Sequence, residues 1–342
     1  MPRPTATPAP HTPNHPIPLR GEEPTAWLLY GFLGLQALQL GVLPTLLLLR
    51  HAAWGWLLLL PVALTPTWWA YVHDCIHGSA FTHRRLNRMA GRANAVLFGA
   101  PFDLLRQGHL LHHAYSRSPR ESSEVFVPGH GSRLSFTVAY YLRLLGGLYL
   151  SEVLGGWLFL LPTRWLHRLA PRLDRPDNVL GPLTERLLQP STLKAVRQDA
   201  VATLLVYAIA LVAYGHHAWM LLLALYGRAL LVSLMDNVFH YGTALGDARQ
   251  ADNLRLPAWA SRLILHFNLH GMHHLRPGIP WYGLPAALAQ RGESCPRHLL
   301  PALAVQLRGP IEWTALPMRP ASTGAASWPC AADLPHLQKA DR

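Results

Sequence analysis

Long apolar runs alternate along this chain with segments rich in arginine and histidine. Residues 27–49 are almost uncharged, and a second apolar run extends from residue 52 to about residue 72. Two later runs, 200–214 and 218–238, flank the short sequence Gly215-His216-His217. A helix needs roughly 20 apolar residues to cross the hydrocarbon layer of a membrane. The pattern therefore predicts an all-α integral membrane protein, multi-pass, with four transmembrane helices arranged as two hairpins.

The stretch 134–161 is apolar as well, but it contains Arg143 and Glu152 and two Gly-Gly pairs. The flanking segments 73–133 and 162–199 are rich in arginine, which favours the cytoplasmic side of a membrane. A single crossing would separate them, so 134–161 lies in the interface, re-enters, or crosses twice. We favour an interfacial or re-entrant segment, which leaves both chain termini on the cytoplasmic side.

Both ends of the chain differ in composition from the part between them. Eight prolines fall within residues 1–24, and the sequence after about residue 308 is rich in Pro, Ala and Ser. Proline-rich segments with few large apolar side chains do not form a packed core. We expect a disordered tail over residues 1–25, one domain over residues 26–307, and a loose C-terminal tail over residues 308–342.

The formal net charge of +12 raises the possibility of a nucleic-acid partner. The basic residues lie between the apolar runs, however, where positive loops orient a membrane protein. Half of the residues are hydrophobic and only 14% are charged, which indicates a bilayer environment. We therefore expect a membrane location and no nucleic-acid partner.

Histidine is the most unusual feature of the composition, with 20 residues. Nine of them lie just beyond the ends of the predicted crossings, as one pair, two triplets and a single residue. They are His73 and His77; His109, His112 and His113; His270, His273 and His274; and His240.

The spacing within these clusters has a physical consequence. Residues i, i+3 and i+4 share one face of a helix, so each cluster directs its imidazoles to one place. Imidazole nitrogens suit iron, copper and zinc. Nine imidazoles are too many for one metal ion and suit two, with open positions left for dioxygen.

Some acidic and amide residues lie near these clusters. Asp236 is one helical turn before His240, where its carboxylate would serve as a ligand or as an acceptor that orients an imidazole. Other candidates for these roles are Asn268, Asp74 and Glu124. We expect eight further histidines to lie outside the site: His266, His51, His83, His130, His167, His216, His217 and His298.

At these motifs the chain resembles the membrane fatty acid desaturase superfamily. The first motif is His73-Asp74-Cys75-Ile76-His77-Gly78-Ser79, and the second ends His109-x-x-His112-His113. The third, Asn268-Leu269-His270-Gly271-Met272-His273-His274, continues with Ile279-Pro280-Trp281-Tyr282 and Leu284-Pro285. The resemblance covers about residues 26–290.

The resemblance implies a helical membrane portion with interfacial helices, a cytosolic helical portion that holds a non-haem di-iron centre (two Fe), and a lipid tunnel. Carried over by position, the nine histidines would be the iron ligands. Some relatives have an asparagine that completes the second metal site where this chain has Asp236.

The implied function is a dioxygen-dependent fatty acyl desaturase, an oxidoreductase that inserts a cis double bond into an acyl-lipid or acyl-CoA chain. A lipid-chain hydroxylase or a carotenoid ketolase is the alternative on the same scaffold. A metal-binding transporter or sensor is a third possibility, and it would need polar residues within the crossings. The predicted crossings contain almost none, and the histidines lie at their ends, which argues against this possibility.

The sequence contains no dinucleotide-binding fingerprint and no fused cytochrome or ferredoxin domain. A separate electron donor is therefore expected: a ferredoxin, a rubredoxin, or a b-type cytochrome with a reductase.

Overall fold

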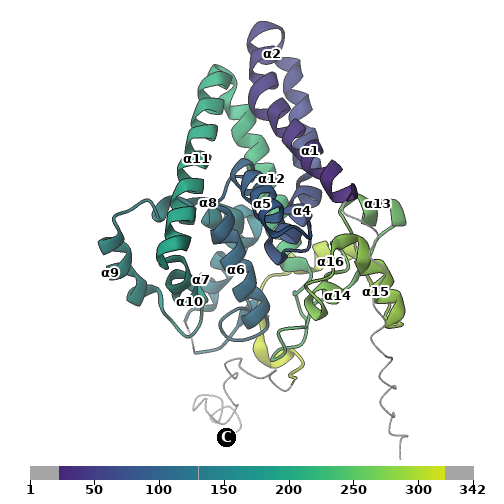
Figure 1. Cartoon of the computed structure of the whole chain (residues 1–342). Helices are drawn as coiled ribbons and strands as arrows, with labels where there is room; N and C mark the ends of the chain where they lie inside the picture. The colour runs from purple at the N-terminus through teal and green to yellow at the C-terminus, as the bar shows by residue number, and fades with distance from the viewer. Residues whose placement is uncertain (1–22, 130, 320–342) are drawn as a thin grey trace, which may run out of the picture.

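The computed structural model describes residues 23–129 and 131–319, so most of both predicted tails and His130 lie outside the described residues. The chain is mostly helical. Figure 1 shows long helices that extend in one direction from a body of shorter helices.

The elements up to residue 126 are α1 (Glu23–Ala37), η1 (Leu38–Val42), α2 (Leu43–Leu49), η2 (Ala52–Leu58), α3 (Leu59–Ala63), α4 (Thr65–His77), α5 (Arg84–Phe98), α6 (Phe102–Tyr115) and β1 (Val125–Phe126). Those up to residue 238 are α7 (Arg133–Leu142), η3 (Arg143–Gly147), α8 (Leu148–Leu158), α9 (Thr163–Leu173), α10 (Leu180–Leu187), α11 (Pro190–Tyr214), η4 (Gly215–His217) and α12 (Ala218–Val238). The rest are β2 (Leu254–Arg255), α13 (Ala258–Leu263), α14 (His270–Leu275), η5 (Trp281–Gly283), α15 (Leu284–Gln290), β3 (Arg297–His298), α16 (Leu299–Gln306), β4 (Ile311–Glu312) and η6 (Trp313–Ala315).

Two helical segments are long and apolar enough to cross a membrane, Thr25–Leu47 and Pro190–Val238. A third qualifies if Ala52–Ala63 and Thr65–His77, which meet at a bend of 43°, form one span. Large apolar side chains on these helices face outward, and Val212 is 81% exposed and Trp27 76% exposed. Such a surface suits lipid rather than water.

The segment Pro190–Val238 changes direction at Gly215, whose φ is +52°. A positive φ is readily adopted by glycine and rarely by other residues. Figure 1 shows α11 and α12 running side by side in opposite directions from this turn. α11 begins ten residues before the apolar run predicted to start at residue 200, and its first turns pack against α10.

The stretch predicted to be interfacial or re-entrant forms two helices, α7 and α8, joined by η3. Non-helical backbone at Leu145 and at Gly146, where φ is +115°, breaks the helix there. The two α-helices have 10 and 11 residues, about half the length needed to cross a bilayer. A Cβ atom on Gly146 would lie 3.3 Å from Cβ of Ala229, so η3 packs closely on α12.

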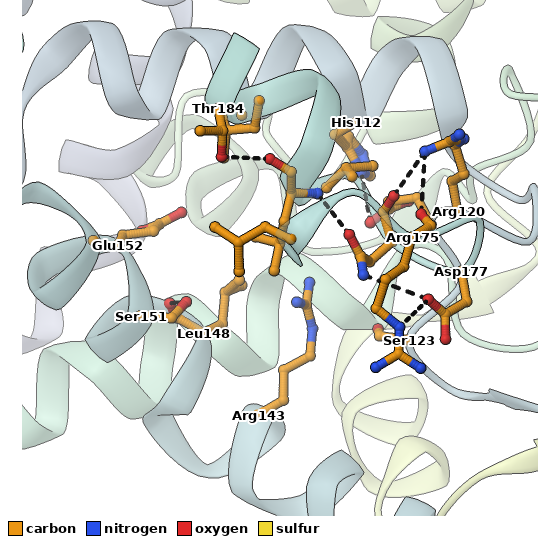
Figure 2. A pocket seen from close by; sticks show the side chains of 18 of the residues that line it. His112, Arg120, Ser123, Arg143, Leu148, Ser151, Glu152, Arg175, Asp177 and Thr184 are labelled. Atoms are coloured by element: carbon orange, nitrogen blue, oxygen red, sulfur yellow. Dashed lines mark hydrogen bonds and ion pairs between the residues drawn. The ribbon is translucent and has the colours of Figure 1, made fainter. Parts of the chain in front are cut away.

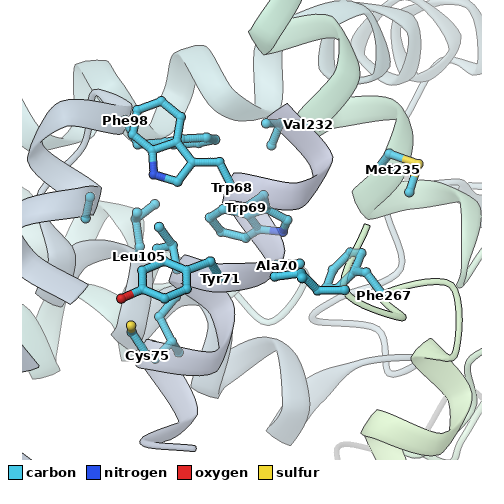
Figure 3. Close-up of a cluster of buried hydrophobic side chains, with 14 of the residues drawn as sticks. Trp68, Trp69, Ala70, Tyr71, Cys75, Phe98, Leu105, Val232, Met235 and Phe267 are labelled. Carbon is cyan, nitrogen blue, oxygen red and sulfur yellow. The ribbon is translucent and has the colours of Figure 1, made fainter. Parts of the chain in front are cut away.

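An aromatic core joins the long helices to the body. Figure 3 shows Trp68 and Trp69 of α4 beside Phe98 of α5. The rings of Trp68 and Phe98 meet edge to face with centroids 4.9 Å apart, a favourable arrangement for aromatic pairs. The Trp68 indole N–H donates to Oδ1 of Asn94 at 3.0 Å. This packing holds α4 against α5, and α4 carries the first two clustered histidines.

The body also contains two short pairs of parallel strands, β1 with β4 and β2 with β3. Val125 pairs with Ile311, and Trp313 packs beside Leu245 in the same small cluster. Residues 308–319, which the sequence predicts as the start of a loose tail, are thus packed against the body. The sequence missed this because a pair of two-residue strands has no detectable period.

Candidate metal centre

The nine clustered histidines come from four separate parts of the chain. His73 and His77 lie one turn apart on α4, and His109, His112 and His113 lie on the last turns of α6. His240 lies two residues after the end of α12, and the short helix α14 carries the last triplet, which consists of His270, His273 and His274.

These side chains converge into two adjacent groups, each with its ligand nitrogens within 4.8 Å of one another. The first group contains His73, His77, His109, His113 and His273, and the second contains His112, His240, His270 and His274. Both triplets are divided between the groups, so α6 and α14 each contribute to both. The fold thus brings together all nine histidines that the sequence singled out; their role as ligands remains a prediction.

The spacing of the nitrogens fits bound metal ions. In the first group, Nε2 of His109 lies 2.9 Å from Nε2 of His77 and 3.0 Å from that of His113, which in turn lies 3.0 Å from that of His273. In the second group, Nε2 of His112 lies 3.1 Å from Nε2 of His240. Two imidazoles at right angles about an ion, each with a bond of about 2.1 Å, have nitrogens about 3 Å apart.

Hydrogen bonds among the imidazoles cannot account for this arrangement. A ring nitrogen of a neutral imidazole carries one proton or one lone pair, yet Nε2 of His109 faces two other Nε2 atoms. Nε2 of His73 is buried without a hydrogen-bond partner among the described residues. A cation at the centre of each group would satisfy all these lone pairs, so the donor set fits two metal ions.

Hydrogen bonds at the opposite ring nitrogens orient three members of the second group. Nδ1 of His240 lies 3.2 Å from the carbonyl oxygen of Gln250, and Nδ1 of His274 lies 3.1 Å from that of Ala248. A proton held at Nδ1 leaves the lone pair on Nε2, where a metal would bind. The third member, His112, is oriented by the carboxylate of Glu121.

Glu121 is the functional candidate that the sequence did not reveal. Its Oε1 lies 3.2 Å from Nδ1 of His112. The loop after α6 turns sharply at Arg117, where φ is +62°, and the Arg117 N–H donates to the Glu121 carbonyl at 2.9 Å. The turn brings Glu121 back to α6. Nothing in the spacing of Glu121 from the histidines signals this contact.

Burial and the neighbouring histidines set the protonation of the centre. Burial lowers the pKa of most of these imidazoles: His109, His113, His240, His270, His273 and His274. A neutral imidazole has the free lone pair that a metal requires. The pKa of His112 is instead raised, because the charge of Glu121 outweighs the effect of burial. Burial raises the pKa of Glu121, but the charge of His112 and the hydrogen bond with it dominate and lower it to about 2.

The other predicted candidates have different surroundings. Asp236 lies with its Oδ2 3.6 Å from Nη2 of Arg143. Asn268 donates to the carbonyl of Leu254 at 2.7 Å and accepts from Oγ of Ser261, so it fixes the loop before α14.

The carboxylates of the remaining two candidates accept hydrogen bonds from groups other than imidazoles. Asp74 accepts a hydrogen bond from the Trp281 N–H at 2.9 Å, which ties α4 to η5, and it lies 4.0 Å from Nδ1 of His73. Glu124 forms a buried ion pair with Arg117 at 2.5 Å. His266 lies outside both groups, with Nδ1 2.8 Å from Oγ of Ser261.

A cavity of about 1130 Å³ adjoins the centre and includes His109 and His112 in its wall. Much of the lining is apolar and comes from α4, α6, α8, α9 and α10: Trp69, Leu104, Leu105, Leu148, Leu158, Phe159, Leu166, Leu169, Leu173, Leu180 and Leu183. Figure 2 shows Leu148 and His112 on different sides of this space, with Arg120, Arg175 and Asp177 gathered at one end. Arg175 and Asp177 are more than half exposed, so this end is open to the outside.

Comparison with known proteins adds two findings. The model of a family described as fatty acid desaturase matches residues 51–305, a region that includes all nine histidines and most of the long helices. None of the curated proteins compared with the chain matches it.

Proposed function

The chain belongs to the fatty acid desaturase family, and we propose that it is a dioxygen-dependent fatty acyl desaturase that inserts a cis double bond into an acyl-lipid or acyl-CoA chain. The observation that carries the proposal is that one histidine of each group, His109 of the first and His112 of the second, lies in the wall of a large and mostly apolar cavity. A desaturase needs both a metal centre and a place for a long chain beside it.

The proposed cofactor is a pair of non-haem iron ions held by the nine histidines. When bound and reduced, two such ions would activate dioxygen for attack on an unactivated C–H bond. Imidazole ligands suit iron, and the neutral state that burial favours leaves their lone pairs available. Glu121 and the carbonyls of Gln250 and Ala248 would hold His112, His240 and His274 in orientation.

The proposed role of the cavity is to hold the chain so that one methylene lies next to the centre. A saturated chain offers no group for acid–base chemistry at the reacting carbon, so selectivity has to come from position. The leucines of α6, α8 and α10, together with the rings of Trp69 and Phe159, give this region an apolar wall that matches the hydrocarbon surface.

We further propose four membrane crossings: α1 with α2, the bent pair that ends in α4, α11, and α12. The reversal at Gly215 divides Pro190–Val238 into two helices of 25 and 21 residues, each sufficient to cross a bilayer. The arginine-rich segments that flank α7 and α8 then favour the cytoplasmic side for the metal centre and both termini. α9 suits the interface, because Leu166 is buried whereas Arg164, Trp165 and Arg168 are exposed.

The two electrons for each turnover would come from a separate protein, for which we propose a ferredoxin, a rubredoxin, or a b-type cytochrome with its reductase. The surface around the metal centre is where such a donor would dock under this proposal.

Lipid analysis of a heterologous host, with and without the gene, tests the proposed function. New cis double bonds that appear only with the gene, and not with a His112→Ala variant inserted to the same level, would support desaturation. New hydroxyl or keto groups would contradict desaturation and support the alternative, a hydroxylase or a ketolase. No oxidised lipid in the presence of a suitable donor would contradict both.

A further inference from the structure

One part of the cavity wall carries charge among apolar side chains. Arg143 from the start of η3, Glu152 from α8 and Asp236 from the last turn of α12 all line it. Figure 2 shows the side chains of Arg143 and Glu152 directed toward the same space beside Leu148. These three residues, which we call the inner polar site, are distinct from Arg175 and Asp177 at the open end.

The inner polar site lies close to the metal centre. Asp236 is one turn before His240, and the charges of Asp236 and Arg143 both influence the pKa of His112. A group held by this site would therefore be a short distance along the chain from the carbon that is oxidised.

Two side chains of the inner polar site have hydrogen-bonding groups that are available to a ligand. The contact between Arg143 and Asp236 is long, at 3.6 Å, and a guanidinium has five N–H donors. Oε2 of Glu152 is buried and has no hydrogen-bond partner among the described residues. A buried polar oxygen without a partner costs free energy, and a purely hydrocarbon ligand would leave it in that state.

The charge of the inner polar site indicates what it can bind. Burial, together with the charge of Asp236, raises the pKa of Glu152 to about 8 even though Arg143 opposes this. At neutral pH Glu152 is then mainly a neutral acid that can donate and accept. Arg143 shares the cavity wall with two further carboxyl groups, Asp236 and Glu121, and its charge acts on the pKa of both. These carboxyl groups around Arg143 disfavour a phosphate, and a hydroxyl or amide, which both donates and accepts, matches Glu152 and Arg143 without bringing a further charge into the site.

We propose that the substrate is a long lipid chain that carries a neutral hydroxyl or amide group near the carbon to be oxidised, and that Glu152 and Arg143 hold this group. This inference rests on the proposed function, because it takes the cavity to be the substrate site. Glu152 is thus a specificity-determining residue, and chains with no polar group at that position are poorer ligands.

The test compares the binding of two labelled probes to the purified full-length protein in detergent. The probes are N-octadecylacetamide and an unbranched alkane of equal chain length. We expect the amide to bind at least about 10-fold more tightly than the alkane, the effect of one hydrogen bond to a charged or buried polar group. Glu152→Leu should remove this preference without weakening binding of the alkane, whereas Glu152→Gln, which keeps a neutral donor and acceptor, should retain it.

Glu185 provides the matched control, because it is an exposed glutamate on α10 that does not line the cavity. Glu185→Leu should leave both affinities unchanged. Equal binding of the two probes to the unaltered protein would overturn the inference, as would a Glu152→Leu variant that weakens both probes equally.

The proposed function can fail separately. If the amide preference depends on Glu152 but no lipid is oxidised, the inner polar site stands and the desaturase proposal falls. If plain chains are oxidised equally by the unaltered protein and by Glu152→Leu, the desaturase proposal stands and the inference about the inner polar site falls.

Discussion

Nδ1 of His112 and Oε1 of Glu121 lie 3.2 Å apart, although a sharp turn and the end of α6 separate the two residues along the chain. In the second group, the Nδ1 atoms of His240 and His274 face backbone carbonyls, and in the first group Nδ1 of His73 lies 4.0 Å from the Asp74 carboxylate. His112 is the one with a carboxylate within hydrogen-bonding distance of a ring nitrogen. Glu121 would both orient this imidazole and make it a stronger electron donor to a bound ion.

Removing this carboxylate should weaken metal binding. We expect Glu121→Ala to lower the affinity for the metal in the second histidine group by about 10- to 100-fold, the usual effect of losing such a partner. Competition with a chelator of known affinity would measure it. Glu185→Ala serves as the control, and an unchanged affinity in Glu121→Ala would show that the contact has no role in holding the metal.

The division of the histidines into two groups predicts separable losses of metal. His273 belongs to the first group and His274 to the second. If each group holds one iron, as proposed, His273→Ala and His274→Ala should each lose mainly one of the two, and the double variant should lose both. Elemental analysis of the purified proteins would measure this. His266→Ala, in the loop just before α14 and outside both groups, should keep its full metal content, and an equal loss from it would contradict the assignment.

Arg228 is a buried cation in the middle of α12, only 2% exposed. It donates to the Phe98 carbonyl and the Tyr207 hydroxyl at 2.9 Å and to Oε1 of Gln39 at 3.1 Å, and it lies over the Trp68 ring. Arg228 of α12 thus connects η1, α5 and α11.

We expect Arg228→Met to reduce the free energy of unfolding by about 3 kcal/mol, because it leaves several buried acceptors without a donor. Thermal unfolding in detergent would show the loss as a lower midpoint. Arg50→Met, at an exposed position in the turn after α2, should have little effect. Equal midpoints for the two variants would indicate that Arg228 is not a structural tie.

Glu152 predicts a dependence of stability on pH. Its pKa is raised to about 8 in the folded protein, first by burial, and is near 4.3 in an unfolded chain. Below the pKa of the unfolded chain, Glu152 is protonated in both the folded and the unfolded state and does not affect the free energy of unfolding. As the pH rises from that value to about 8, the folded state becomes progressively less stable, because only the unfolded chain ionises freely.

Glu152→Gln should therefore raise the unfolding midpoint at pH 8 to 9 and leave it unchanged near pH 4, as judged by thermal unfolding across a pH series. The exposed Glu185→Gln should show no such trend. A Glu152→Gln effect that is constant with pH would mean that the carboxyl is already ionised in the folded protein.

Several parts of the fold followed from local patterns. The apolar runs predicted the long helices because burial in a bilayer requires continuous apolar sequence, and the i, i+3, i+4 spacing predicted that each histidine cluster shares a helical face. Local patterns did not predict the contacts of Arg228. Its partners are residues 39, 98 and 207, and no local pattern indicates a contact across such sequence separations.

By itself, the sequence determined which nine histidines converge, that the chain contains long apolar helices, and that it resembles the desaturases. Each of these depends on residues close together in the chain. Only the tertiary structure decided how the triplets divide between two groups, that Glu121 rather than Glu124 meets His112, and that Arg143, Glu152 and Asp236 line one cavity with the metal centre. These relationships depend on how α6, α8, α12 and α14 pack against one another, and packing is set by the whole set of contacts rather than by any one segment.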